Sequence, residues 1–305
     1  MTTAATPELR ATLVGLLAIL IWSSLALFAV LAGPVPPFQL VAMAFTVVFA
    51  VAFLRWILRG ENPLDHMHLP LPVWALGITG LFGYHFFYFL GVQNAPPAEA
   101  NLINYLWPVL IVLFANLLPA EAGVGRLRWH HIAGAGAGLL GTVVLIGGGS
   151  ADDGGGLTFR AEYAGGYLAA LAAAITWAGY SVTSRRIAHI STDSIGAFCG
   201  ATAALAWIAH GVLEPTVWPG DPVSWLAVLS LGLGPVGLAF FFWDHGVKHG
   251  NLRVLGAAAY LAPLLSTIGL VVLGFAAASL PLALACALIV GGGLLAAKDM
   301  FRRSA

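Results

Sequence analysis

The sequence predicts an all-α integral membrane protein whose ten transmembrane helices form two inverted five-helix repeats. Three observations predict this fold. Hydrophobic residues make up 60% of the chain and charged residues only 9%. The apolar residues fall into blocks of membrane-spanning length, and the two halves of the chain align at one fixed offset.

The composition excludes an ordinary soluble fold. A soluble domain carries about 25% charged residues, whereas this chain of 305 residues carries 9%. Blocks such as Ala11–Leu31 and Val254–Phe275 have the length of about 20 residues that crosses a hydrocarbon core. Because the net charge is zero, no basic face favours nucleic acid as a partner.

Polar or Pro/Gly-rich breaks divide the apolar residues into ten expected spans. Helices are expected because an unpaired backbone group in lipid costs several kcal/mol, and because the glycine-rich blocks do not alternate like barrel strands. The expected spans are Ala11–Leu31, Phe38–Leu58, Leu71–Val92, Ala98–Leu118, Ile132–Gly149, Ala164–Ser184, Ser194–Leu213, Val223–Gly246, Leu252–Phe275 and Leu280–Ala297.

Lysine and arginine predict the orientation, because cytoplasmic loops carry an excess of both. With ten spans, 12 of the 13 Lys and Arg residues fall on the side of the N-terminus, and Arg160 alone falls on the other side. Both termini are therefore expected in the cytoplasm. The 12 residues are Arg10, Arg55, Arg59, Arg126, Arg128, Arg185, Arg186, Lys248, Arg253, Lys298, Arg302 and Arg303.

The two halves come into register when the chain is shifted by 155 residues. Matched Trp, Tyr and Pro at one shared offset indicate an internal repeat, whereas matches of Leu, Ala and Gly would arise by chance. Since five is odd, the second copy starts on the opposite side of the membrane and is inverted. The matched pairs include Trp22 with Trp177, Phe86 with Phe241, Tyr105 with Tyr260, and Pro108 with Pro263.

The repeat predicts three parts of the chain. Residues 1–150 form the first five-helix repeat, residues 151–163 a periplasmic linker with acidic and glycine residues, and residues 164–305 the second repeat. Inverted repeats are typical of secondary transporters, whose substrate site lies near the midplane between the halves. Pro108 and Pro263 each remove a backbone donor and predict breaks that free the carbonyls of Asn104 and Ala259.

The tryptophans in the first helix of each half, the prolines in the fourth helix, and the motif Tyr105-Leu106-Trp107-Pro108 resemble the drug/metabolite transporter superfamily. The resemblance covers nearly the whole chain and is closest to the EamA type. The segments Leu90–Val92, Ala100–Pro108 and Trp243–Gly246 are similar to those of YddG-type aromatic amino-acid exporters. The resemblance implies an exporter of aromatic amino acids in the bacterial inner membrane, surrounded by lipid, as a monomer or weak homodimer.

The sequence contains no HExxH, GxSxG or phosphate-cradling motif, so no enzyme activity, metal or cofactor is expected. Cys199 and Cys286 lie apart in apolar blocks and lack zinc-ligand spacing. Acidic residues are absent from most spans except at the edges, which favours a neutral or zwitterionic substrate over a lipophilic cation. A broader metabolite or drug permease and an intramembrane enzyme remain the alternatives.

The candidate binding site combines uncharged polar groups with aromatic rings. Polar side chains in lipid normally face protein or a watery cavity, although the same residues can simply join helices. Asn101, Asn104 and His85 are expected to hydrogen-bond a zwitterion. The expected aromatic walls are Trp22, Tyr84, Tyr88, Tyr105, Trp107, Trp177, Trp243 and Tyr260.

Three further patterns carry structural expectations. Asp244 and Lys248 have the spacing of an interfacial helical ion pair. Small residues at Gly134 and Gly138, and at Gly292 and Ala296, predict close helix packing, either within the fold or between protomers. The tryptophans expected near the lipid headgroups are Trp56, Trp74, Trp129, Trp218 and Trp225.

Overall fold

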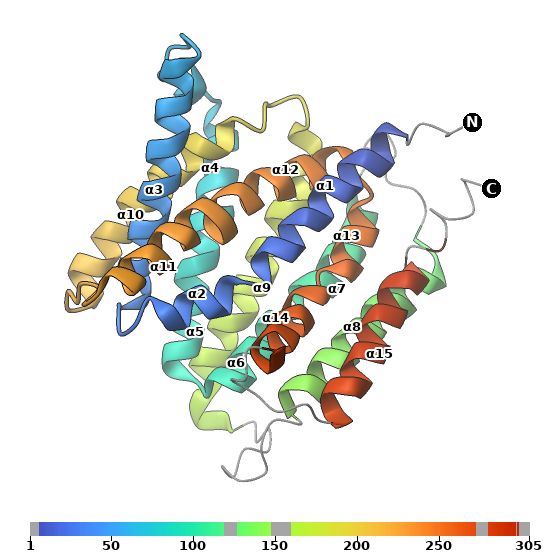
Figure 1. The fold of residues 1–305 in the computed structure, drawn as a ribbon. Helices are drawn as coiled ribbons and strands as arrows, with labels where there is room; N and C mark the ends of the chain where they lie inside the picture. Colours follow the sequence, from blue (N-terminus) through green and yellow to red (C-terminus); the bar gives the residue numbers. More distant parts are fainter. Residues whose placement is uncertain (1–5, 119–126, 148–159, 273–279, 297, 299–305) are drawn as a thin grey trace.

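The computed structural model describes residues 6–118, 127–147, 160–272, 280–296 and 298, and every regular element in these ranges is helical (Figure 1). Among the described residues, six helical stretches are long and apolar enough to cross a membrane, which makes the chain a multi-pass membrane protein. They are Pro7–Leu31, Pro37–Leu58, Leu71–Asn94, Glu99–Leu117, Ser194–Leu213 and Pro222–His249. Most of the expected linker lies outside the described residues.

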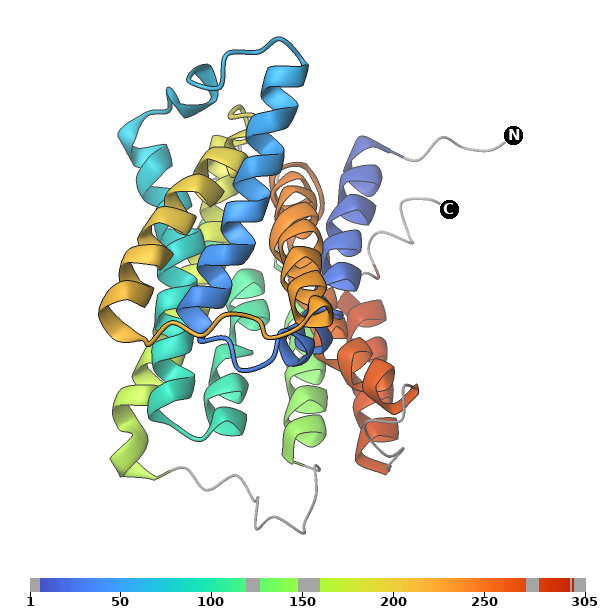
Figure 2. The ribbon, with the colours of Figure 1, turned by 60° about the vertical axis from the view of Figure 1, so that its left-hand side comes forward.

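The helices pack together as a bundle (Figure 2). The first half contains α1 (Pro7–Trp22), α2 (Leu25–Leu31), α3 (Pro37–Leu58), α4 (Leu71–Ile78), α5 (Tyr84–Asn94), α6 (Pro97–Asn104), α7 (Trp107–Phe114), the short η3 (Ala115–Leu117) and α8 (Trp129–Gly147). The second half contains α9 (Ala164–Ser184), the short η7 (Arg185–Ile187), α10 (Ser194–Leu213), α11 (Pro222–Leu233), α12 (Ala239–His249), α13 (Leu252–Ala258), α14 (Leu261–Val272) and α15 (Leu280–Ala296).

The first expected span is interrupted, which the sequence did not predict. A turn at Ser23 and Ser24 separates α1 from α2. The Ser23 hydroxyl donates to the Leu20 carbonyl at 2.6 Å, and the Ser24 hydroxyl donates to the Ile21 carbonyl at 2.7 Å. Such side-chain bonds compete with the helical ladder. Because of the break, Trp22 is the last residue of α1.

The two proline breaks occur where they were expected. α6 ends at Asn104, just before Pro108, and α13 ends at Ala258, before Pro263. The expectation that Pro263 frees the Ala259 carbonyl is wrong, because the Ala262 amide donates to that carbonyl at 3.1 Å. A tighter turn therefore satisfies the acceptor that the proline leaves behind.

Two helices widen to π-helical turns at matching places. The segment η2 (Thr79–Gly83) joins α4 to α5, and η8 (Gly234–Leu238) joins α11 to α12. Their first residues, 79 and 234, are 155 positions apart, which is the offset between the halves. π-helical turns often occur at functional sites, and η8 contributes a carbonyl to the tryptophan cluster described below.

Helices α8 and α15 pack along their glycines and lie side by side in both views (Figures 1 and 2). A Cβ atom on Gly134 would lie 2.5 Å from the Gly292 carbonyl oxygen and 2.9 Å from the Ala296 amide nitrogen. The small residues therefore form a contact within the fold, which resolves the choice left open by the sequence.

Replacing Gly134 with alanine should destabilise the protein by about 1 to 3 kcal/mol, because the new methyl group meets rigid backbone atoms. Gly136 on the same helix is the matched control, since nothing lies within 4 Å of its Cβ position. Gly136→Ala should be neutral or stabilising, because alanine is the better helix former. The unfolding midpoint in mixed micelles measures both. Equal effects of the two substitutions would contradict the close contact.

Glu214 holds the start of α3 against the end of α10. Its Oε1 accepts from the Phe38 amide at 3.0 Å, and its Oε2 accepts from the Gln39 amide at 3.1 Å. A carboxylate suits the positive end of a helix dipole. The Nδ1 atom of His210 lies 3.2 Å from the same Oε2. These bonds join two helices far apart in the sequence.

The five tryptophans expected at the lipid headgroups differ in exposure, and Trp74 is half-buried with its Nε1 donating to the Met67 carbonyl at 3.2 Å. Trp129, Trp218 and Trp225 are 67%, 55% and 43% exposed, as that role requires. Trp56 is fully buried and stacks on the His66 ring at 4.4 Å, so the expectation for Trp56 is wrong. Trp56 lies near the end of a span, but the sequence did not show that the following loop, which contains His66, folds back over its ring.

Candidate functional site

Four tryptophans from four helices form one cluster, here called the tryptophan tetrad. Trp22, Trp107, Trp177 and Trp243 come from α1, α7, α9 and α12. All six ring pairs have centroid separations between 5.1 and 6.4 Å. Most of these pairs meet edge to face or tilted, an arrangement that the ring quadrupoles favour. Rings far apart in the sequence thus form one aromatic centre.

Two indole donors of the tetrad are already satisfied by protein. Trp22 Nε1 donates to the Pro235 carbonyl in η8 at 2.9 Å. Trp243 Nε1 donates to the Ser181 hydroxyl on α9 at 3.0 Å. These bonds fix the ring planes and occupy both indole N–H groups.

A polar patch adjoins the tetrad through Tyr84. The Tyr84 ring lies 5.3 Å from Trp177 and stacks on Tyr88 at 6.0 Å with 14° between the planes. The Tyr88 hydroxyl donates to Asn101 Oδ1 at 2.8 Å. Asn104 Nδ2 donates to the Tyr84 hydroxyl at 3.3 Å. Helices α5 and α6 therefore supply hydrogen-bonding groups beside an aromatic wall.

Among the residues that the structure describes, none donates a hydrogen bond to the side-chain oxygen of Asn104, although Asn104 is only 4% exposed. Leaving a buried acceptor unsatisfied costs about 1 to 3 kcal/mol. A fold keeps such an acceptor when a ligand or a water molecule satisfies it during function. Asn104 Oδ1 is thus a buried acceptor of this patch that a donor on a ligand could satisfy.

His85 extends the patch towards α3. Its Nδ1 lies 2.7 Å from the Leu81 carbonyl, so Nδ1 carries the proton and donates. The ring packs edge-on against Phe45 at 5.3 Å and against Tyr84 at 5.1 Å. With the proton on Nδ1, the Nε2 atom of a neutral His85 is a hydrogen-bond acceptor.

Tyr260 lies differently from the other candidates. Tyr260 is fully buried, and its hydroxyl donates to the Tyr105 carbonyl at 2.9 Å. The Tyr260 ring packs against Gly138, where a Cβ atom would lie 2.3 Å from the ring. Tyr105 packs against the cluster of Tyr260, Leu264 and Ile289. The structure thus places Tyr260 behind the break between α6 and α7 and does not bring it to the tetrad.

The sequence missed the residues that join the tetrad to the polar patch. Phe240 lies 6.0 Å from Trp22, 5.5 Å from Trp177 and 6.2 Å from His85. Ser181 supplies the hydrogen bond to Trp243. Phe240 begins a run of aromatic residues, Phe240–Trp243, and no pattern in that run shows which ring faces the centre.

The chain matches known transporters over nearly all of its length. The model of the EamA-like transporter family matches residues 9–147 and again residues 164–298. The aromatic amino acid exporter YddG of Ancylobacter novellus is 54% identical over 94% of this chain and 96% of that protein. The exporter of the same name from Escherichia coli is 25% identical, over 94% of this chain and 96% of the relative.

A solved structure has the same fold. This crystal structure superposes with a TM-score of 0.86 at 53% identity. The superposition covers 94% of this chain and 98% of the other. With the family model matching both halves, the chain belongs to the EamA-like transporter family, and it is a multi-pass membrane transporter.

Proposed function

We propose that this protein exports aromatic amino acids across the bacterial inner membrane by alternating access, without catalysing a reaction. The observation that carries the proposal is the tryptophan tetrad beside an uncharged polar patch whose Asn104 Oδ1 has no partner. Relatives at 54% and 25% identity bear the name of aromatic amino acid exporters. The amino acid is the small-molecule partner in this proposal.

The ring of the substrate would pack on the tetrad. Aromatic pairs contribute about 0.5 to 1.5 kcal/mol beyond the burial of their area. Trp22, Trp107, Trp177 and Trp243 present several ring faces and edges within one small region. An aliphatic side chain would also bury apolar surface there, but it would lack the additional free energy of aromatic ring pairs. The site should therefore bind phenylalanine more tightly than leucine.

The zwitterionic head group would bind the polar patch. A substrate ammonium is a charged donor, and Asn104 Oδ1 is a buried acceptor without a partner. Asn101, His85 and the Tyr84 and Tyr88 hydroxyls complete an uncharged set of hydrogen-bonding groups. A neutral site suits a zwitterion, because a buried unpaired charge on the protein would raise the cost of the empty state. Tyr105 would add a ring to the wall of this patch, and Tyr260 would hold the break between α6 and α7 behind it.

The proposed architecture is ten spans in two inverted repeats, residues 1–150 and 164–305, joined by a periplasmic linker at 151–163. The paired π-helical turns, the paired proline breaks and the double match of the family model support it. Both termini would lie in the cytoplasm, which the excess of Lys and Arg on the side of the N-terminus favours. The protein would work as a monomer or weak homodimer in lipid.

Uptake of labelled phenylalanine, leucine and lysine into proteoliposomes tests the proposal. Phenylalanine should move fastest and lysine not at all. Asn104→Leu should lower kcat/KM for phenylalanine by about 10- to 150-fold, because a hydrogen bond to a charged group contributes about 1.5 to 3 kcal/mol. Asn94, whose Nδ2 donates to the Leu90 carbonyl at the exposed end of α5, is the control.

Two results would contradict different parts of the proposal: the first the substrate class, the second the role of Asn104. Leucine moving as fast as phenylalanine would assign the protein to a broader metabolite or drug permease. Unchanged phenylalanine transport in Asn104→Leu, with phenylalanine still preferred, would remove Asn104 from the site and leave the function standing. Asn94→Leu should match the wild type in either case.

A further inference from the structure

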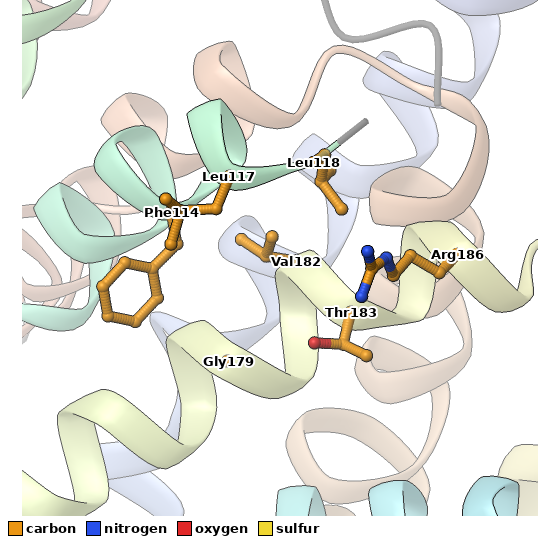
Figure 3. A pocket seen from close by; sticks show the side chains of 7 residues that line it. All are labelled: Phe114, Leu117, Leu118, Gly179, Val182, Thr183 and Arg186. Atoms are coloured by element: carbon orange, nitrogen blue, oxygen red, sulfur yellow. The ribbon is translucent and has the colours of Figure 1, made fainter. Parts of the chain in front are cut away.

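A cavity of about 220 Å³ lies between the end of the α7–η3 segment and the end of α9 (Figure 3). Its wall is mostly apolar, with one hydroxyl and one guanidinium. The lining residues are Phe114, Leu117, Leu118, Gly179, Val182, Thr183 and Arg186. The cavity is larger than the engineered cavity of roughly 150 Å³ that binds benzene. It can therefore accommodate part of a hydrocarbon chain.

The cavity lies on the face of α9 that turns away from the tetrad. Successive helical residues are about 100° apart, so Gly179 lies about 200° around the helix from Trp177. Leu168 and Ile175 share the face of Gly179 and Arg186, and they are 67% and 46% exposed. Apolar side chains exposed along a spanning helix contact lipid. In the proposed ten-span architecture this face of α9 is turned towards lipid, and the proposed substrate site lies on the opposite side of the helix.

Arg186 places its charge at this cavity. Figure 3 shows its side chain running back along α9, with the guanidinium between Thr183 and Leu118. Within the described part of the chain, no carboxylate forms an ion pair with Arg186. The neighbouring Arg185 instead donates to the Gly250 carbonyl at 2.6 Å, so it ties two loops together. Arg186 is exposed and available to an anion.

We propose that this cavity binds an anionic phospholipid, with the phosphate on Arg186 and an acyl segment along Phe114, Leu117 and Gly179. Guanidinium groups bind phosphate through two parallel hydrogen bonds. Basic pockets between membrane-spanning helices are suited to anionic head groups. Thr183 adds a hydroxyl beside the guanidinium. An apolar crevice with a cation at one end matches the division of a phospholipid into tail and head.

Native mass spectrometry of the full chain tests the proposal with dioleoylphosphatidylglycerol and dioleoylphosphatidylcholine as probes. The wild type should retain phosphatidylglycerol in preference to phosphatidylcholine. Arg186→Gln should weaken phosphatidylglycerol binding about tenfold, as expected for a charge-assisted hydrogen bond. Arg59→Gln removes an equal charge from an exposed side chain at the end of α3 and should change binding little.

A substitution that fills the cavity tests whether it binds the acyl chain of the lipid. Nothing lies within 4 Å of the Cβ position of Gly179, and Gly179 lines the cavity, so a leucine side chain there would extend into the crevice. Gly179→Leu should reduce phosphatidylglycerol binding several-fold. Gly165 on the same helix also has nothing within 4 Å, and Gly165→Leu is the matched control. The two arginine variants and the two glycine variants should all remain monodisperse and helical, because their side chains extend into solvent or open space.

Three outcomes would overturn the proposal. The first is equal phosphatidylglycerol binding by Arg186→Gln and Arg59→Gln. The second is displacement of the lipid by inorganic phosphate alone, which would show an anion site that does not recognise a tail. The third is displacement by phenylalanine, lost in Arg186→Gln, which would assign the cavity to the transported substrate.

Discussion

Replacing Asp244 with asparagine will lower the free energy of unfolding by about 3 to 5 kcal/mol, the cost of leaving a buried charge without its partner. Asp244 Oδ2 lies 2.8 Å from Lys248 Nζ, and the two side chains are 2% and 1% exposed. The Thr192 hydroxyl donates to Asp244 at 2.6 Å, and Lys248 donates to the Ile190 carbonyl at 2.9 Å. The asparagine keeps the shape and leaves the Lys248 ammonium uncompensated.

The ion pair at Arg55 and Asp193 provides the control for Asp244→Asn. These side chains are 40% and 25% exposed and lie 2.9 Å apart. Asp193→Asn should cost less than about 1 kcal/mol, because water screens the charge that remains. The double variant Asp244→Leu with Lys248→Met should recover most of the loss, since an apolar pair needs no counter-ion. Unfolding midpoints in mixed micelles measure all three. A loss in the double variant as large as in Asp244→Asn would contradict this account.

Replacing Trp243 with alanine will destabilise the protein by about 3 to 5 kcal/mol, the usual cost of removing a large buried aromatic side chain. Trp243 is fully buried and lies 5.1 Å from Trp22 and 5.7 Å from Trp107. In a membrane protein the loss comes from van der Waals packing rather than from exclusion of water. The cavity left at the centre of four helices cannot close without moving all of them.

Trp225→Ala is the control for Trp243→Ala. Trp225 is 43% exposed, so its removal should change the unfolding midpoint little. Ser181→Ala should cost about 1 to 3 kcal/mol, because it leaves the buried Trp243 N–H without its acceptor. If Trp225→Ala and Trp243→Ala proved equally costly, the tetrad would not be a packed centre.

Much of the bundle could be predicted from hydropathy. The expected spans Ala164–Ser184 and Ser194–Leu213 have the bounds of α9 and α10. Of the two, Ser194–Leu213 is among the described helices that are long and apolar enough to cross a membrane. Hydropathy predicts such helices because in lipid the backbone must form its hydrogen bonds within each helix. It could not predict the turn at Ser23 and Ser24 or the two π-helical turns. Those irregularities depend on side-chain hydrogen bonds and helix contacts that average hydropathy does not contain.

The candidate site was predictable in part. Trp22 and Trp177 were identified by their repeated position, and the structure brings them within 5.8 Å of each other. Phe240 was missed, because an aromatic run gives no sign of which ring faces inward. Tyr260 shares its repeat position with Tyr105, yet it packs behind the helix break. Repeated position indicates equivalent places in two helices, but the contacts of each place depend on different neighbours.

The sequence by itself determined that this chain is a helical membrane protein, that it resembles EamA-type transporters, and where its uninterrupted helices α9 and α10 begin and end. These features follow from the local cost of placing backbone and charge in lipid. Only the tertiary structure decided that Trp56 is buried, that the Asp244–Lys248 pair is enclosed, and that Asn104 keeps a free acceptor. Those outcomes depend on which helices meet, and contacts between distant segments leave no periodic trace in the chain.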